Sequence, residues 1–119
     1  MPGVESNLVL LPRFTTLVGE GVEFATLPVD VSRYGTAQLL LWRGELQLTG
    51  GTPVFQAYFE ESLDAEDWHP RSSVATPIDP GEDQTYLVNY TFRLKWFRVR
   101  IVLGGDGAMT TCWAEGVLR

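Results

Sequence analysis

The sequence predicts an all-β fold, an antiparallel β-sandwich of jelly-roll-like type with about seven to eight strands. Two segments carry this prediction, because residues 54–63 alternate apolar and polar side chains and residues 96–103, WFRVRIVL, do the same. Side chains of a strand point alternately to opposite faces, so a period of two marks a sheet with one buried face. Turn signals also recur roughly every 8–15 residues, without a helical period, as in a sandwich.

The first part of the chain contains three expected strands. Residues 7–11 form the first and stop at Pro12, residues 13–18 form the second and end at a Gly-Glu-Gly turn, and residues 22–27 form the third, before Pro28. Proline has no backbone N–H to donate to a ladder, so it marks strand ends and blunts exposed sheet edges.

The middle of the chain reads as a hairpin followed by a long loop. Residues 36–48 form a long strand with a bulge near Gly44, and a Gly-Gly turn leads from it into the strand 54–63. We expect these two strands to pair. Residues 69–80 have the least pattern and are expected to be a loop, ending in a proline–glycine turn.

The last part reads as a strand and a second hairpin. Residues 85–94 follow the turn, and a glycine-rich turn joins the strand 96–103 to a final strand over 108–118. The strand 96–103 is also the expected partner of 54–63. Its alternation predicts four core residues and an outer face formed by the residues between them. The predicted core residues are Phe97, Val99, Ile101 and Leu103, and the predicted outer residues are Trp96, Arg98 and Arg100.

Length and composition fit one domain over residues 1–119, a size that buries roughly two thirds of its unfolded surface. With a net charge of −6 the chain repels phosphate backbones, so no nucleic-acid partner is expected. No apolar run approaches the roughly 20 residues of a membrane span, so no membrane partner is expected either. The N-terminus, with Glu5 and no basic lead-in, is not a secretory signal, and the single Cys112 cannot form an internal disulfide. We therefore expect synthesis in a cytoplasm.

Candidate catalytic and metal-binding residues are few. Five carboxylates lie in eight residues, but their spacing does not match a calcium-binding loop, and the first two point to opposite faces of a regular strand. The five are Glu60, Glu61, Asp64, Glu66 and Asp67. His69, the only histidine, lacks the partners of a zinc site and the motif of a serine hydrolase. We assign no catalytic, cofactor-binding or metal-binding residue and expect a protein that is not an enzyme, with a solvated acidic turn.

The aromatic residues allow a second interpretation. Exposed rings beside polar groups stack on sugars, so a saccharide-binding platform is the alternative to a purely structural role. Trp96 is the expected exposed ring, with Arg98 lying over an aromatic neighbour. Trp68 follows a turn, where a large ring can plug the end of a sandwich.

Two motifs resemble known families. The run FEESLDAEDWHP at 59–70, followed by KWFRVRIVL at 95–103, is similar to segments of small β-sandwich structural proteins of tailed bacteriophages, and also to discoidin-like jelly rolls. The phage resemblance implies a decoration, fibre or tail protein located in the virion. The discoidin resemblance implies a carbohydrate-binding module, but discoidin-type modules are secreted and disulfide-closed, which this chain does not match.

The resulting hypothesis is a structural component of a virion or similar particle, homo-oligomeric and bound to a shell or tail protein. A basic strip and the acidic turn are its expected interface, since opposite charges on neighbouring copies orient association. The alternative is that the two patches pair within one subunit. The interface candidates are Arg93, Lys95, Trp96, Arg98 and Arg100 in the strip, and Glu60, Asp64, Glu66 and Asp67 in the turn.

Overall fold

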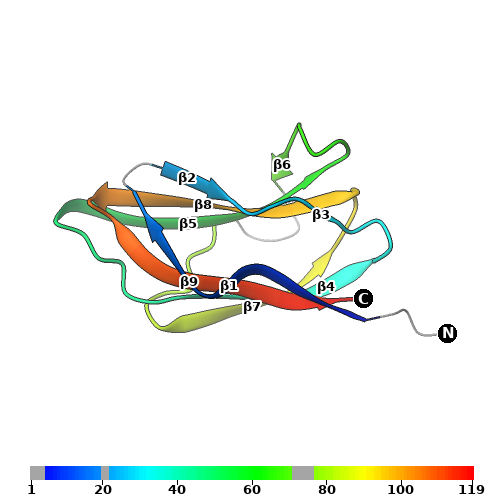
Figure 1. Ribbon diagram of the computed structural model, residues 1–119, viewed down its shortest axis with the longest axis horizontal. Coiled ribbons are helices and arrows are strands. Elements are labelled where there is room, and N and C mark those ends of the chain that lie inside the picture. Colours follow the sequence, from blue (N-terminus) through cyan, green and yellow to red (C-terminus); the bar gives the residue numbers. More distant parts are fainter. Residues whose placement is uncertain (1–4, 20–21, 71–76) are drawn as a thin grey trace.

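The computed structural model describes residues 5–19, 22–70 and 77–119, and in these residues the chain is a β-sandwich (Figure 1). Nine strands follow one another in this part of the chain. They are β1 (Ser6–Val18), β2 (Val22–Ala25), β3 (Val29–Asp30), β4 (Thr36–Arg43), β5 (Gly50–Ser62), β6 (His69–Pro70), β7 (Gln84–Thr91), β8 (Trp96–Asp106) and β9 (Met109–Leu118).

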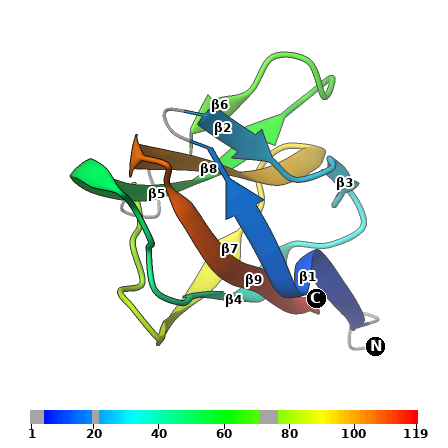
Figure 2. The same cartoon turned by 60° about the vertical axis from the view of Figure 1, so that its left-hand side comes forward.

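The strands form two antiparallel sheets that face each other (Figures 1 and 2). One sheet has the order β1-β9-β4-β7 and the other the order β2-β8-β5-β6, while the short β3 pairs with β8 beyond the end of β2. Because β2 and β3 lie along the same edge of β8, they count as one interrupted strand. The result is two four-stranded sheets in which most consecutive strands alternate between sheets, which confirms the predicted jelly-roll-like sandwich.

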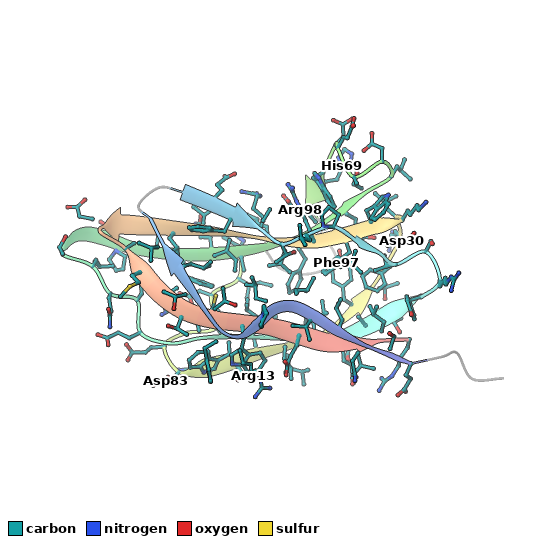
Figure 3. All side chains as sticks on the ribbon, in the orientation of Figure 1. Arg13, Asp30, His69, Asp83, Phe97 and Arg98 are labelled. Carbon is teal, nitrogen blue, oxygen red and sulfur yellow. The ribbon has the colours of Figure 1, made fainter. Side chains whose placement is uncertain are left out.

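The core forms where the inner faces of the two sheets meet. Phe97, Val99, Ile101 and Leu103 of β8 are each at most 1 % exposed, which confirms the alternation predicted from the sequence. Figure 3 shows Phe97 between the sheets, while Arg98 lies on the outer side of its sheet. The ring of Phe97 packs against three other buried aromatic rings, with centroid distances of 6.0 Å to Phe59, 5.1 Å to Tyr90 and 5.3 Å to Phe92.

A buried carboxylate joins the sheets at one end of this core. Glu61 is fully buried and accepts a hydrogen bond from the Tyr90 hydroxyl at 2.8 Å. It also accepts hydrogen bonds from the backbone N–H groups of Arg93 at 2.7 Å and Leu94 at 2.8 Å. Buried polar groups are stable when their hydrogen bonds are satisfied, so Glu61 fixes the connection between β7 and β8 against β5.

The predicted pairing of 54–63 with 96–103 is confirmed, since β5 and β8 form a ladder from Val54↔Gly104 to Ser62↔Trp96. Both predicted hairpins are wrong. β4 pairs with β7 and β9 but not with β5, and β8 pairs with β2, β3 and β5 but not with β9. The first connection is 44–49, because β4 ends at Arg43 and not at residue 48, and the predicted Gly-Gly turn is instead the start of β5. The second connection lies within the predicted glycine-rich turn, and both carry the chain across to the opposite sheet. Gly105 and Gly107 adopt positive φ values of 109° and 63° at the second of these turns.

Two smaller expectations also need correction. Pro12 does not end a strand, because β1 continues through it with register shifts from Val9 to Leu11 and from Leu11 to Thr15. A proline fits there because β1 is an edge strand with a broken ladder. The segment 69–80 is not only a loop, since β6 pairs with β5 and buried Ile78 forms a bridge with Ala57. Residues 71–76 lie outside the described part.

Candidate functional site

The outer face of the β2-β8-β5-β6 sheet carries most of the charged residues predicted for the interface. Glu60 of β5 stands opposite Arg98 of β8 in the ladder, and Arg100 lies two residues further along β8. The Glu60 carboxylate accepts hydrogen bonds from Arg98 Nε and Arg100 Nε, both at 3.0 Å, and its side chain is only 5 % exposed. The pairing within the subunit, which the sequence left as the alternative, therefore holds for these three residues.

Two aromatic rings complete this cluster. The guanidinium of Arg98 lies 4.3 Å from the centre of the Trp68 ring, and that of Arg100 lies 4.2 Å from the Tyr58 ring. The predicted contact of Arg98 with an aromatic neighbour is confirmed. The suggestion that Trp68 plugs the sandwich is wrong, because the ring is partly exposed and covers the outer face. Such cation–π contacts hold both guanidinium groups against the outer face of the sheet.

The pKa of Arg100 follows from these contacts. Burial lowers the pKa of Arg100. The hydrogen bond and the charge of Glu60, together with the charge of Glu23, raise this pKa by a larger amount. An oxygen of Glu23 lies 2.9 Å from Arg100 Nη1. The net effect is a raised pKa, so Arg100 remains a cation.

An open hollow of about 730 Å³ lies above this cluster. It brings together Glu60, Glu66, Asp67, Arg98 and Arg100 from the predicted interface. Glu23, Trp68 and His69 complete its lining. Figure 3 shows His69 and Arg98 on this side of the molecule. The hollow combines an aromatic ring with carboxylates, cations and an imidazole, which are groups that can hydrogen-bond to a polar ligand.

The acidic turn is only partly the solvated turn that the sequence predicts. Asp64, Glu66 and Asp67 are exposed, but Glu60 and Glu61 are buried on opposite faces of β5, the first paired with arginines and the second inside the core. Their opposite orientation confirms the expectation from strand periodicity. Their burial contradicts the solvated interpretation, because each has enough partners to leave water.

Asp64 organises the turn. Its carboxylate accepts hydrogen bonds at 2.9 Å from the backbone N–H groups of Asp67 and Glu66 and from the Ser62 hydroxyl. These donors stabilise the charged form and lower the pKa of Asp64 to about 2, with the Asp67 N–H as the largest cause. Asp64 acts as the local cap of this turn and does not line the hollow.

The remaining predicted interface residues lie apart from the hollow. Trp96 is partly buried, with the Lys95 ammonium 5.5 Å from its ring centre and 4.0 Å from Asp30 Oδ2. Arg93 is exposed in the connection from β7 to β8. The basic strip of the sequence is therefore divided between the paired arginines of the hollow and two exposed cations at the end of the sandwich.

The outer face of the other sheet, which the sequence analysis missed, is poor in charge and rich in apolar side chains, with uncharged polar residues such as Gln38 and Asn89 between them. Strands β1, β4, β7 and β9 contain only three charged residues, Arg13, Arg43 and Glu115, whereas the strands of the opposite sheet contain seven. Strand alternation points apolar side chains outward from all four strands. We call this surface the apolar face; its outward apolar residues are Val9, Phe14, Val18, Leu40, Trp42, Leu87, Trp113 and Val117.

Aromatic rings occupy the middle of the apolar face. The Trp42 and Trp113 rings stack at 6.4 Å with an angle of 14°, and Phe14 packs edge-on against Trp42 at 5.4 Å. The Arg13 guanidinium lies 3.9 Å from the Trp113 ring centre and pairs with Glu115. The two charges on this face therefore neutralise each other (Figure 3 labels Arg13).

Both protruding and recessed parts of the apolar face are exposed. Phe14 is 65 % exposed and Leu87 62 %. A hollow of about 360 Å³ lies on the same face, where Val9, Leu40 and Val117 contribute to its lining. The sequence signal for this face is the run LLLW at 39–42, because an unbroken apolar run in a strand indicates apolar side chains on both faces.

The remaining reactive groups are potential metal ligands and the thiol of Cys112. Within them, no group of three or more His, Cys, Asp and Glu side chains is arranged to hold a metal ion. Burial raises the pKa of the Cys112 thiol to about 11, which keeps it protonated at neutral pH. The described part of the chain also lacks any helix with the length and apolar character to cross a membrane.

Comparison with known proteins leaves the family open. No family model matches the chain, and searches of the curated proteins and of the solved structures find no match.

Proposed function

We propose that this protein is a non-enzymatic structural component of a virion or similar particle, such as a capsid decoration, fibre or tail protein. Its work is to bind proteins, namely copies of itself and a shell or tail protein. The observation that carries the proposal is the apolar face, a complete sheet surface with one neutralised pair of charges. Interface cores are depleted of charged residues and enriched in aromatic rings, as this face is.

The apolar face offers enough area to anchor a partner. Leu87 and Phe14 are more than 60 % exposed, and fully burying a side chain of this size contributes about 1.5–3 kcal/mol. The partly exposed Trp42 ring stacks on the buried Trp113 ring, and aromatic anchors of this kind dominate binding energy in the centres of interfaces. Large exposed apolar patches on soluble proteins mark sites of this kind.

The test is fractionation of the cells that produce the protein. Particles separated on a density gradient are expected to carry the wild-type protein, located with an antibody. The variant Leu87→Glu puts a charge in the apolar face and is expected to remain in the free fraction at the top of the gradient. Leu27→Glu, at a position 85 % exposed outside this face, is the matched control and should stay with the particles. Wild-type protein found only in the free fraction would overturn the proposal.

The hollow beside Trp68 favours a second function, binding of a saccharide. A partly exposed indole ring next to Glu66, Asp67 and His69 provides an apolar surface for a sugar ring and hydrogen-bonding groups for its hydroxyls. A bound sugar stabilises the folded state by mass action, so a saccharide ligand should raise the Tm of the wild type and not that of Trp68→Ala. Trp96→Ala, outside the hollow, is the control. A glycan panel that leaves the wild-type Tm unchanged would exclude this function.

A further inference from the structure

The apolar face has the properties of a surface that binds a second copy of itself. We propose that two copies pack through their apolar faces about a twofold axis that lies in the plane of the interface and runs perpendicular to the strands. This arrangement rests on the proposed function and specifies its first partner. An axis in this direction reverses the strands of one copy relative to the other, so opposite ends of the two sandwiches meet.

The shape of the face fits this axis. Phe14 protrudes beside Trp42, toward the end of β4, whereas the apolar hollow lies at Leu40 and Val117, nearer the start of β4 and the end of β9. The protrusion and the hollow are thus displaced from each other along the strand direction. When the strands of the second copy are reversed, its protrusion comes over the hollow of the first copy, and the reciprocal contact forms at the same time.

The charges at the two ends of this sheet fit the same axis. The end where β4 starts and β7 and β9 finish has four cations and two carboxylates among the described residues. They are Arg33, Arg93, Lys95, Arg119, Glu5 and Asp30. Arg119 pairs with Glu5 and Lys95 lies 4.0 Å from Asp30, so Arg33 and Arg93 supply the net positive charge of this end. The opposite end, where β4 finishes and β7 and β9 start, has five carboxylates and one cation. They are Glu45, Asp79, Glu82, Asp83, Asp106 and Arg43.

These ends lie far apart along the longest dimension of the molecule, which measures 53 Å. In Figure 3, Asp83 lies toward the left of the view, at the end opposite to that of Asp30. Reversed packing sets the cationic end of each copy against the acidic end of the other, whereas packing with parallel strands would set like charges together. Such rim charges fix the orientation of a complex, while the apolar centre supplies its adhesion.

The charges at the centre of the apolar face do not oppose its burial by a second copy. Its two charges, Arg13 and Glu115, already pair with each other, and the Arg13 guanidinium is stacked on Trp113. A second copy therefore covers no unpaired charge at this position. A net charge of −6 would make two copies repel each other over most other surfaces, and the near-neutral face is where a copy can approach.

Light scattering after size-exclusion chromatography tests the second copy as the partner. Wild-type protein is expected to elute as a dimer over a range of concentrations. Leu87→Glu should raise the dissociation constant of the dimer by about 30-fold or more, as expected for an anchor residue, while Leu27→Glu leaves it unchanged. Loss of a dimer by itself lowers the Tm, so an unchanged far-UV circular dichroism spectrum, and not the Tm, verifies that each variant is folded.

Cross-linking tests the orientation. Thr85 and Thr91 are exposed at opposite ends of β7, about 20 Å apart along the strand. A mixture of Thr85→Cys and Thr91→Cys chains, treated with a short thiol cross-linker, should give the mixed covalent dimer, and buried Cys112 should not react. Dimers that cross-link only through two copies of the same variant, or not at all, would overturn the reversed arrangement.

The oligomeric state and the gradient experiment together distinguish a wrong dimer from a wrong proposed function. Wild-type protein that remains monomeric at every concentration overturns the dimer. If Leu87→Glu nevertheless prevents binding to particles in the gradient, the apolar face binds the shell or tail protein and the proposed function stands. If the monomeric wild type also fails to bind particles, both are wrong.

Discussion

Glu60 and Arg98 face each other across β5 and β8, with Glu60 Oε1 3.0 Å from Arg98 Nε and 2.9 Å from Nη2. The second carboxylate oxygen of Glu60 binds Arg100, so one buried anion holds two cations against the outer face of the sheet. This arrangement makes Arg98 and Arg100, two of the four cations of the predicted basic strip, part of a structural cluster. It also explains how a glutamate can be buried on a face that is otherwise open to solvent.

Replacing Glu60 should destabilise the fold. Glu60→Ala leaves Arg98 and Arg100, each about 20 % exposed, with their main partner removed. We expect the free energy of unfolding to fall by about 3 kcal/mol in urea melts, because breaking a buried ion pair leaves uncompensated charge. Glu23→Ala removes a carboxylate that is 60 % exposed and should cost less than about 1 kcal/mol. Equal losses for both variants would contradict the bridging role of Glu60.

The alternation of β8 predicts opposite outcomes for two neighbouring aliphatic residues. Ile101 is 1 % exposed and packs in the core, whereas Val102 points to the outer face. Ile101→Ala should lower the free energy of unfolding by about 2–5 kcal/mol through lost burial and the cavity that remains. Val102→Ala should cost about 1 kcal/mol or less. Similar losses at the two positions would refute this assignment of faces.

The acidic turn should respond to pH through Asp64. Its folded-state pKa of about 2 lies below the ordinary value of 3.8, so the folded state favours the charged carboxylate. The resulting stabilisation is fully present above pH 3.8 and is lost as the pH falls through about 2. Carboxyl NMR should give a midpoint near 2 for Asp64, and the stability advantage of wild type over Asp64→Asn should shrink over this window. Asp67→Asn, which keeps the backbone N–H that Asp64 accepts, is the control.

The buried thiol should be unreactive in the folded protein. Cys112 is completely buried in β9, and burial raises its pKa to about 11, so both access and thiolate formation are suppressed. A thiol reagent at neutral pH should modify the protein only at the rate of unfolding, and modification should be fast in denaturant. Rapid modification of native protein would show that β9 opens locally.

The sequence predicted the residues that face the core better than it predicted the order of the strands. Periodicity is a local property, so the inward side chains of β8 and the opposite orientations of Glu60 and Glu61 follow from a few adjacent residues. A glycine-rich turn suits both a hairpin and an arch between sheets. The choice between them depends on which distant strands compete for each edge, and the turn residues contain no information about that competition.

The apolar face was missed for a related reason. The sequence predicts a strand over 36–48, and in the observed strand β4, Thr36–Arg43, Leu39 and Leu41 are buried. Leu40 and Trp42 point the other way, and their exposure depends on whether another layer covers that side of the sheet. Phe14 meets Trp42 only because β1 and β4 flank β9, a neighbourhood that spans most of the chain.

The place of β9 in its sheet has a consequence for synthesis on the ribosome. β9 lies between β1 and β4, although both precede it in the chain, and the register joins Ser6 to Leu118. While the nascent chain is growing, β4 and β7 can already pair, but β1 has no partner strand and its apolar side chains stay accessible to chaperones. The sheet becomes continuous only when β9 emerges from the ribosome and inserts between β1 and β4. The final step of folding must therefore follow translation of this strand. This step forms the contacts of longest sequence separation, and such contacts form slowly.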